Sequence, residues 1–101
     1  MTDQNAVSPD RFSLHQNYPN PFNPETTIQY QMPKRSEVKL VIFSLLGQRV
    51  ATLVDEVQSI GVYSVQWDGK DDTGKEVASG VYLYQLQTEQ FVQVKKLALL
   101  R

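Results

Sequence analysis

Three prolines within six positions constrain this chain more than any other feature of its sequence. They belong to the run Asn17-Tyr18-Pro19-Asn20-Pro21-Phe22-Asn23-Pro24. Because proline lacks a backbone N–H and restricts φ, this run cannot form a helix and predicts an extended, turn-rich segment. The asparagines between the prolines can hydrogen-bond to their own backbone and stabilise turns. The segment leads directly into Thr26–Met32, where apolar and polar residues alternate as in a half-buried strand.

The rest of the chain contains further short strand candidates separated by turn residues. Alternating polarity predicts seven strands in all, and no window shows a convincing helical period. The predicted strands are Phe12–Gln16, Thr26–Met32, Val38–Ser44, Gln48–Val54, Gly61–Trp67, Gly80–Thr88 and Phe91–Leu100. Asp55–Ile60 is expected to be a looser connection with room for a helical turn. Gly47 is placed where a short hairpin loop needs a positive φ. This pattern predicts an all-β, immunoglobulin-like antiparallel β-sandwich of about seven strands.

Length and composition exclude several classes of protein. A chain of 101 residues suits one domain, and its net charge of −1 gives no footprint for nucleic acid. The absence of cysteine excludes disulfides and thiolate metal sites. No apolar run of about 18 residues predicts membrane insertion. Residues 1–11 are polar and lack the basic and apolar regions of a signal peptide, so we expect a linker or leader there and the domain itself over residues 12–101.

The densest group of ionisable residues is the acidic stretch Asp68–Glu76. Its carboxylates and glycines could wrap a calcium ion, but the spacing does not match a calcium-binding loop, and Lys70 and Lys75 would oppose a cation. We therefore favour a turn in which aspartates cap backbone amides, with no metal site, and the sequence leaves calcium binding open. His15 is the single histidine, so neither a zinc site nor a Ser/His pair can be assembled readily. We expect no cofactor and no enzymatic activity.

Aromatic side chains offer a second alternative, a carbohydrate-stacking platform. Most of them occupy alternating strand positions beside Val, Leu and Ile, which favours core packing instead. The aromatic residues considered are Tyr18, Phe22, Tyr30, Phe43, Tyr63, Trp67, Tyr82, Tyr84 and Phe91.

An ordered set of short motifs carries a family resemblance that covers roughly Phe12 to Arg101. Besides the proline-rich run, the motifs are Leu45-Leu46-Gly47-Gln48, Trp67-Asp68-Gly69, Asp71-Asp72-Thr73-Gly74, Ala78-Ser79-Gly80-Val81-Tyr82-Leu83-Tyr84 and Lys95-Lys96-Leu97-Ala98-Leu99-Leu100-Arg101. The set resembles the type A C-terminal sorting domain of cargo proteins of the type IX (Por) secretion system. It also resembles the related immunoglobulin-like domain of the flagellar hook-cap protein.

The resemblance implies a non-catalytic sorting signal that directs a cargo protein across the bacterial outer membrane. Its implied partners are the type IX translocon, a sortase-like peptidase and the N-terminal cargo domains, with no nucleic acid and no membrane insertion. The implied location, after periplasmic transit, is the medium or the cell surface. Two alternatives stay open: a structural assembly module of the hook-cap type, and a carbohydrate-binding module of a secreted enzyme. A chain that ends within a residue of its last strand favours the sorting signal.

The closing segments act as the export signal in the family that the chain resembles. Carried over residue by residue, the candidate recognition residues are Gly80, Val81, Tyr82, Lys95, Lys96, Leu97, Leu99, Leu100 and Arg101. The last strand contains two lysines, which discourage accidental edge-to-edge pairing. We expect its edge to stay available to another protein, which could add a strand of its own.

Overall fold

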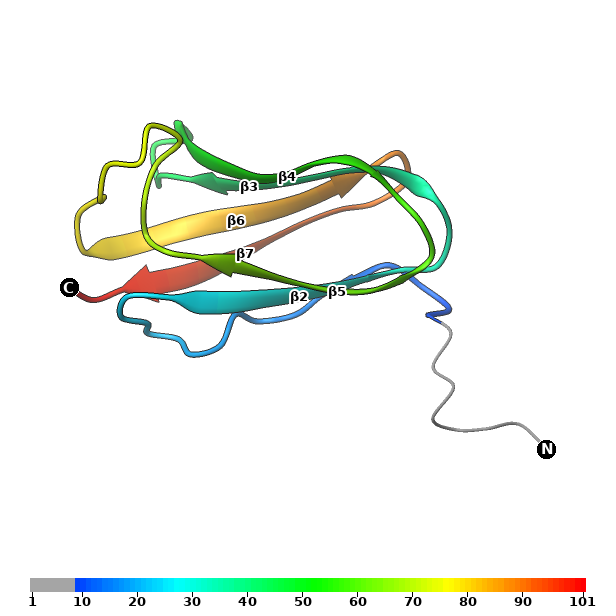
Figure 1. Ribbon diagram of the computed structural model, residues 1–101, viewed down its shortest axis with the longest axis horizontal. Coiled ribbons are helices and arrows are strands. Elements are labelled where there is room, and N and C mark those ends of the chain that lie inside the picture. Colours follow the sequence, from blue (N-terminus) through cyan, green and yellow to red (C-terminus); the bar gives the residue numbers. More distant parts are fainter. Residues whose placement is uncertain (1–8) are drawn as a thin grey trace.

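Two antiparallel β-sheets packed face to face make up the computed structural model, which describes residues 9–101 (Figure 1). One sheet has the strand order β1-β2-β5 and the other β4-β3-β6-β7. The strands are β1 Ser13–Leu14, β2 Thr26–Met32, β3 Ser36–Phe43, β4 Arg49–Gln58, β5 Gly61–Trp67, β6 Gly80–Thr88 and β7 Val92–Leu99. The predicted all-β, immunoglobulin-like sandwich is confirmed. The predicted linker lies mostly outside the described residues.

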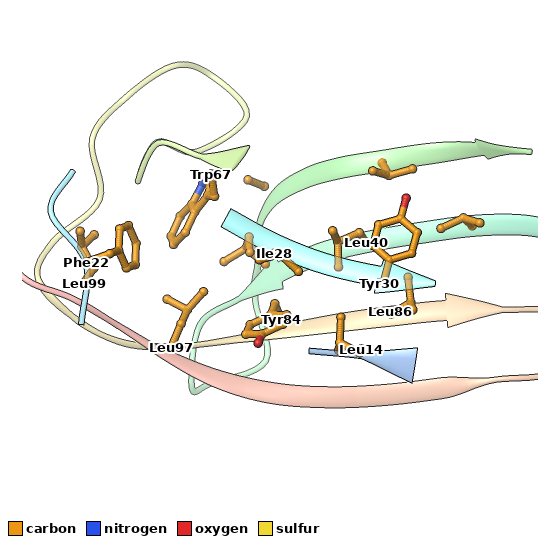
Figure 2. Packing of buried hydrophobic residues seen from close by; sticks show 14 of the residues in the cluster. Leu14, Phe22, Ile28, Tyr30, Leu40, Trp67, Tyr84, Leu86, Leu97 and Leu99 are labelled. Carbon is orange, nitrogen blue, oxygen red and sulfur yellow. The ribbon is translucent and has the colours of Figure 1, made fainter. Parts of the chain in front are cut away.

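Strict alternation along β2 explains how the two layers close over one core. Ile28, Tyr30 and Met32 have no exposed surface, whereas Gln29 between them faces solvent. β2 pairs with β5 over its whole length, so Trp67 joins the same buried side. Alternate residues of β3, β6 and β7 supply the opposite wall of the core (Figure 2). Full burial of each large apolar side chain contributes about 1.5–3 kcal/mol, so this alternation is the main source of stability.

The first strand is shorter than predicted. Only Ser13 and Leu14 form β1, although the N–H of His15 still donates to the carbonyl of Gln29 at 2.9 Å. Regular pairing then stops at Asn17, which is buried and bonds through its side chain to Pro19 and Thr26, and Tyr18 makes only an isolated bridge to Thr27 of β2. The predicted span of five residues was therefore wrong at both ends.

The fourth strand is longer than predicted. β4 continues to Gln58, so Asp55–Ile60 is largely strand and contains no helical turn. Leu53 has no partner in the register with β3, where the pairing shifts at the step Leu40–Val41. Such a β-bulge inserts one residue and breaks the alternation of faces. The two-residue period therefore ends at the bulge although the strand does not.

The β3–β4 hairpin forms as predicted. Gly47 has a φ of 86°, and the turn is closed by the N–H of Ser44, which donates to the carbonyl of Gln48 at 2.9 Å.

Within residues 9–101 there is no helix that could cross a membrane.

Candidate recognition surface

The proline-rich segment crosses from one sheet to the other and closes one side of the sandwich. Tyr18 pairs with Thr27 of β2 through backbone hydrogen bonds of 2.9 Å in both directions. Further along, the N–H of Phe22 donates to the carbonyl of Ala98 at 3.0 Å, and its carbonyl accepts from the N–H of Leu100 at 3.0 Å. Phe22 thus lies beside the end of β7 as a parallel partner. Prolines suit such a crossing because they bring no N–H that needs a partner.

A buried polar network fixes the start of this crossing. Asn17 is 2% exposed, and its Nδ2 donates to the carbonyl of Pro19 at 3.2 Å and to Oγ1 of Thr26 at 2.9 Å. The hydroxyl of Thr26 donates to the same Pro19 carbonyl at 2.8 Å. Nε2 of Gln16 donates to Oδ1 of Asn17 at 2.6 Å. These side-chain groups are all paired, so their burial avoids the cost of an unsatisfied polar atom.

Tyr84 ties the crossing to the four-stranded sheet. Its hydroxyl accepts a hydrogen bond from the N–H of Asn17 at 2.9 Å and donates to the carbonyl of His15 at 2.8 Å. The ring is fully buried, and this burial raises the pKa of Tyr84 to about 12. Tyr30 is similar: burial raises its pKa to about 12, and its hydroxyl donates to Oε1 of Gln58.

Phe22 completes the core at the end where β7 finishes. Figure 2 shows Phe22, Leu99 and Trp67 gathered there. The rings of Phe22 and Trp67 lie 5.6 Å apart at an angle of 53°, and both residues are 1% exposed. The proline-rich segment is therefore part of the folded domain, and its position depends on an aromatic anchor.

The crossing closes the carboxyl half of the β7 edge. Oδ1 of Asn20 accepts a hydrogen bond from the N–H of Ala98 at 2.9 Å. Nε2 of Gln16 donates to the carbonyl of Lys96 at 2.8 Å. Together with the two bonds to Phe22, these contacts occupy the outward backbone groups from the Lys96 carbonyl to the Leu100 N–H. The expectation that the whole edge of the last strand stays available was therefore wrong for this half.

The amino half of the β7 edge has no such cover. In an antiparallel pair, alternate residues direct both N–H and C=O away from the partner strand. The N–H and C=O of Ala98 point away from β6, so the N–H and C=O of Val94 and Val92, two and three pairs of residues earlier, point away from β6 as well. β6 is the single strand neighbour of β7 in the described part of the chain, apart from the bridge at Phe22. Val92 and Val94 are 56% and 48% exposed, so the open edge is flanked by apolar side chains.

The structure brings the two predicted recognition segments side by side. In the register of β6 with β7, Gly80 faces Leu99 and Tyr82 faces Leu97. Leu97 and Leu99 are 1% and 0% exposed, so their side chains fill the core rather than face a partner. Val81, 42% exposed, lies on the outer face of the four-stranded sheet, the face that points away from β2 and β5. Of the other predicted residues, Lys96 and Leu100 are exposed and Lys95 is half-buried.

Arg101 folds back onto the β5–β6 loop. Its N–H donates to Oγ of Ser79 at 2.8 Å and its Nε to the carbonyl of Val77 at 2.6 Å, while Nη2 donates to the carbonyl of Gly69. The guanidinium also lies 3.5 Å from a carboxylate oxygen of Glu76. Gly69 has a φ of 75°, and a Cβ there would lie 2.7 Å from Nη2 of Arg101. The Trp67-Asp68-Gly69 motif therefore includes the glycine that admits this arginine.

The acidic loop caps itself, as the sequence predicted. Oδ1 of Asp71 accepts from the N–H of Thr73 at 2.9 Å, from the Thr73 hydroxyl at 2.6 Å and from the N–H of Lys75 at 3.0 Å. These bonds hold the pKa of Asp71 below its usual value, with the Thr73 hydroxyl bond the largest cause. Oδ1 of Asp72 accepts from the N–H of Thr52 at 2.9 Å, which fastens the loop to β4. Among residues 9–101 no three His, Cys, Asp or Glu side chains are grouped as metal ligands.

His15 and the aromatic side chains do not form a binding site in the described residues. His15 is exposed, and its Nε2 lies 3.3 Å from Oγ of Ser13. Most aromatic side chains are buried or half-buried, as predicted, whereas Tyr18 is 80% exposed. A row of exposed aromatic rings is therefore absent from the described residues.

The fold and this surface define a class of domain: an antiparallel two-sheet sandwich whose proline-rich segment pairs with the end of its last strand. The family model described as "FlgD Ig-like domain" matches residues 22–90, and the chain belongs to this family. No curated protein matches the chain significantly.

Among solved structures, the chain is similar to PorZ of Porphyromonas gingivalis, described as an essential bacterial surface component of the type IX secretion system. The TM-score is 0.60 at 21% identity over 91% of this chain. The chain covers 12% of PorZ, and likeness at this identity shows the fold alone.

Sequence reasoning missed two elements of this surface. It treated Asn17–Pro24 as a rigid lead-in and did not predict that Asn20 and Phe22 pair with β7. It also missed the anchoring of Arg101 at Gly69. The available signals were a lone apolar residue, Phe22, among prolines, and an arginine directly after an apolar strand.

Proposed function

We propose that this chain is a non-catalytic C-terminal sorting domain, which directs a cargo protein across the bacterial outer membrane through the type IX secretion system. The observation that carries the proposal is the open backbone edge at Val92 and Val94, in a β7 strand that is otherwise closed. An unpaired edge flanked by apolar side chains is suited to the addition of a strand from another protein.

The recognition surface in this proposal consists of the open edge and the exposed residues around it. Lys96 lies on the outer face next to that edge, and Val81 lies on the same face farther away, opposite Ala98. Leu97 and Leu99 act indirectly, because their burial holds β7 in register. Recognition of a folded surface needs no catalytic group, so the domain works as a protein-binding signal.

The proposed partners follow from this role. They are the translocon and its sortase-like peptidase, together with cargo domains joined through the polar stretch at residues 1–11. The domain would pass through the periplasm and finish in the medium or at the cell surface. The family and the fold shared with part of PorZ support this proposal without identifying a partner.

One alternative has support of its own, since membership of the FlgD Ig-like family favours a structural assembly module equally well. In that role the same open edge would hold a neighbouring subunit of an extracellular assembly. No observation favours carbohydrate binding.

The test is export of a periplasmic reporter fused to this chain, in a bacterium that has the type IX translocon. Removal of Lys95–Arg101 would be uninformative, because it deletes Leu97 and Leu99 from the core. Val94→Pro is sharper: it removes one outward N–H without breaking the ladder to β6, and edge strands tolerate proline at such positions. We expect the unmodified fusion in the medium or on the surface and the variant retained in the periplasm.

A matched control is Ser64→Pro on β5. Because Thr27 and Gln29 of β2 bond to the opposite side, Ser64 also directs its N–H away from its partner strand. This variant removes one edge donor from the other sheet and should be exported normally. Periplasmic retention of the unmodified fusion would refute the sorting role, and equal export of both variants would refute recognition at the β7 edge.

A further inference from the structure

The outer face of the four-stranded sheet has an apolar centre that no other element covers. In residues 9–101 no strand or helix packs on this side, which faces away from β2 and β5 (Figure 1). The apolar side chains of this outer face come from all four strands. They are Val41, Phe43, Val57, Val81, Leu83, Val92 and Val94, with Gln85 and Gln87 of β6 among them. A sheet face that stays in water usually carries polar residues at such positions.

Opposite charges lie at the two ends of this outer face. Glu37, Asp55 and Glu89 are exposed at one end, where they line an open hollow of about 490 Å³. Lys39 is also exposed there and faces Asp55 across the β3–β4 pair, so this end carries three carboxylates and one ammonium group and is net negative. Arg49 and Lys96 are exposed at the other end, and Arg49 lines a second hollow of about 350 Å³. None of these six side chains forms an ion pair with another residue in the described part of the chain.

The register fixes how these charges are arranged. Phe43 faces Arg49 on β4 and Leu83 on β6, and Leu83 faces Lys96 on β7. The two cations therefore lie in one row across the sheet. Glu37 is six residues from Phe43 along β3, which corresponds to about 20 Å at roughly 3.3 Å per residue. Glu37 and the basic row are thus separated by nearly the length of the sheet, whereas Asp55 lies closer to that row, in register with Lys39.

We propose that this outer face is a two-fold self-association surface and that its occupant is a second copy of this chain. A two-fold axis across the strands, in the plane of contact, lays each basic row over the acidic end of the other copy. β4 then crosses β4, so Arg49 approaches Asp55 of the partner subunit. On the β7 side, Lys96 approaches Glu89 of the partner subunit. Isologous pairing of this kind is the commonest symmetry of soluble oligomers.

The charges select this axis over the alternative. A two-fold axis parallel to the strands would stack each row on its own counterpart, which opposes cation to cation and carboxylate to carboxylate. Like charges brought together at an interface are strongly unfavourable. The axis across the strands instead forms two equivalent sets of opposite-charge contacts around the apolar centre.

The size of the sheet predicts a weak, salt-sensitive dimer. Four strands about 4.8 Å apart and eight residues long, at about 3.3 Å per residue, present roughly 500 Å² per copy. Stable complexes bury about 800 Å² per partner, so this dimer would form at high micromolar concentration. Exposed charge pairs are screened by salt, so we expect about 1 M salt to shift the equilibrium to monomer.

Sedimentation equilibrium of the chain tests the proposal directly. Two variants carry the argument: Arg49→Glu with Lys96→Glu makes both ends acidic, and Asp55→Lys with Glu89→Lys makes both ends basic. All four positions are exposed, so the fold should persist. We expect each variant alone to be monomeric and an equimolar mixture to form a heterodimer.

The matched control is Lys70→Glu with Lys75→Glu, which makes the same change in net charge on the β5–β6 loop. It should dimerise like the unmodified chain. A chain that stays monomeric up to roughly 500 μM at low salt would overturn the proposal. Either a mixture that stays monomeric or a control that dissociates like the acidic variant would also overturn it.

Discussion

Replacement of Tyr84 by phenylalanine removes one oxygen atom from the buried network at the start of the crossing. The hydroxyl accepts from the buried N–H of Asn17 and donates to the carbonyl of His15. Each hydrogen bond contributes about 0.5–1.5 kcal/mol, and a buried group left without a partner costs about 1–3 kcal/mol. In the variant, the N–H of Asn17 loses its acceptor at a buried position, whereas the carbonyl of His15, an exposed residue, can accept from water instead. We therefore expect Tyr84→Phe to lower the free energy of unfolding by about 2–3 kcal/mol.

Equilibrium urea unfolding measures this loss, with Tyr82→Phe as the matched control. The Tyr82 hydroxyl also donates to a backbone carbonyl, that of Ala78 at 2.6 Å, but at an exposed site where water can replace it. We expect the control to change the free energy of unfolding by less than about 0.5 kcal/mol. The thermal midpoint of Tyr84→Phe should fall by roughly 10–20 °C, since each kcal/mol corresponds to about 4–8 °C in a domain of this size.

Equal stability of the two variants would refute the reasoning. If Tyr84→Phe stays within about 0.5 kcal/mol of the unmodified chain, the buried network does not hold the crossing. A second readout separates local from global effects, because loss of the network should speed hydrogen exchange at Asn17 even where the fold persists.

Three further predictions concern the buried tyrosines, Gly69 and Arg101. In the folded chain the pKa values of Tyr30 and Tyr84 are about 12, above the usual 10, so the unfolded chain loses these two protons at lower pH than the folded chain. The stability that these hydroxyls contribute should therefore be full below pH 10 and fall between pH 10 and 12. Thermal midpoints measured across this pH range check the prediction. Gly69→Ala should cost about 2–4 kcal/mol, because strain at positive φ adds to the clash with Arg101, whereas Gly74→Ala, open on all sides, should cost about 1–2 kcal/mol in urea unfolding. Arg101→Ala should cost about 1–2 kcal/mol and speed hydrogen exchange at Val77 and other loop amides, and unchanged exchange there would contradict the anchoring.

Strict alternation decided how much of the fold was predictable. β2, β5 and β6 match their predicted bounds, because no bulge interrupts their period of two. The end of β4 did not match its predicted bound, because the unpaired Leu53 reverses which residues of the strand face the core. Val81 and Leu83 lie on the outer face of β6, because Tyr84, which alternates with them, is buried in the core.

The candidate site was less predictable because it depends on contacts between distant segments. The pairing of Phe22 with the end of β7 joins residues that are far apart in the chain, and local periodicity carries no information about it. Proline content predicted an extended segment correctly but not where it would lie. The capping role of Asp71 was predictable, because an aspartate followed by turn residues bonds to its own backbone.

Amide hydrogen exchange along β7 tests most directly the claim that one half of this strand is closed and the other open. We predict strong protection at Ala98 and Leu100, whose N–H groups bond to the crossing, and rapid exchange at Val94. Protection at Val94 equal to that at Ala98, or rapid exchange at all three positions, would contradict the account.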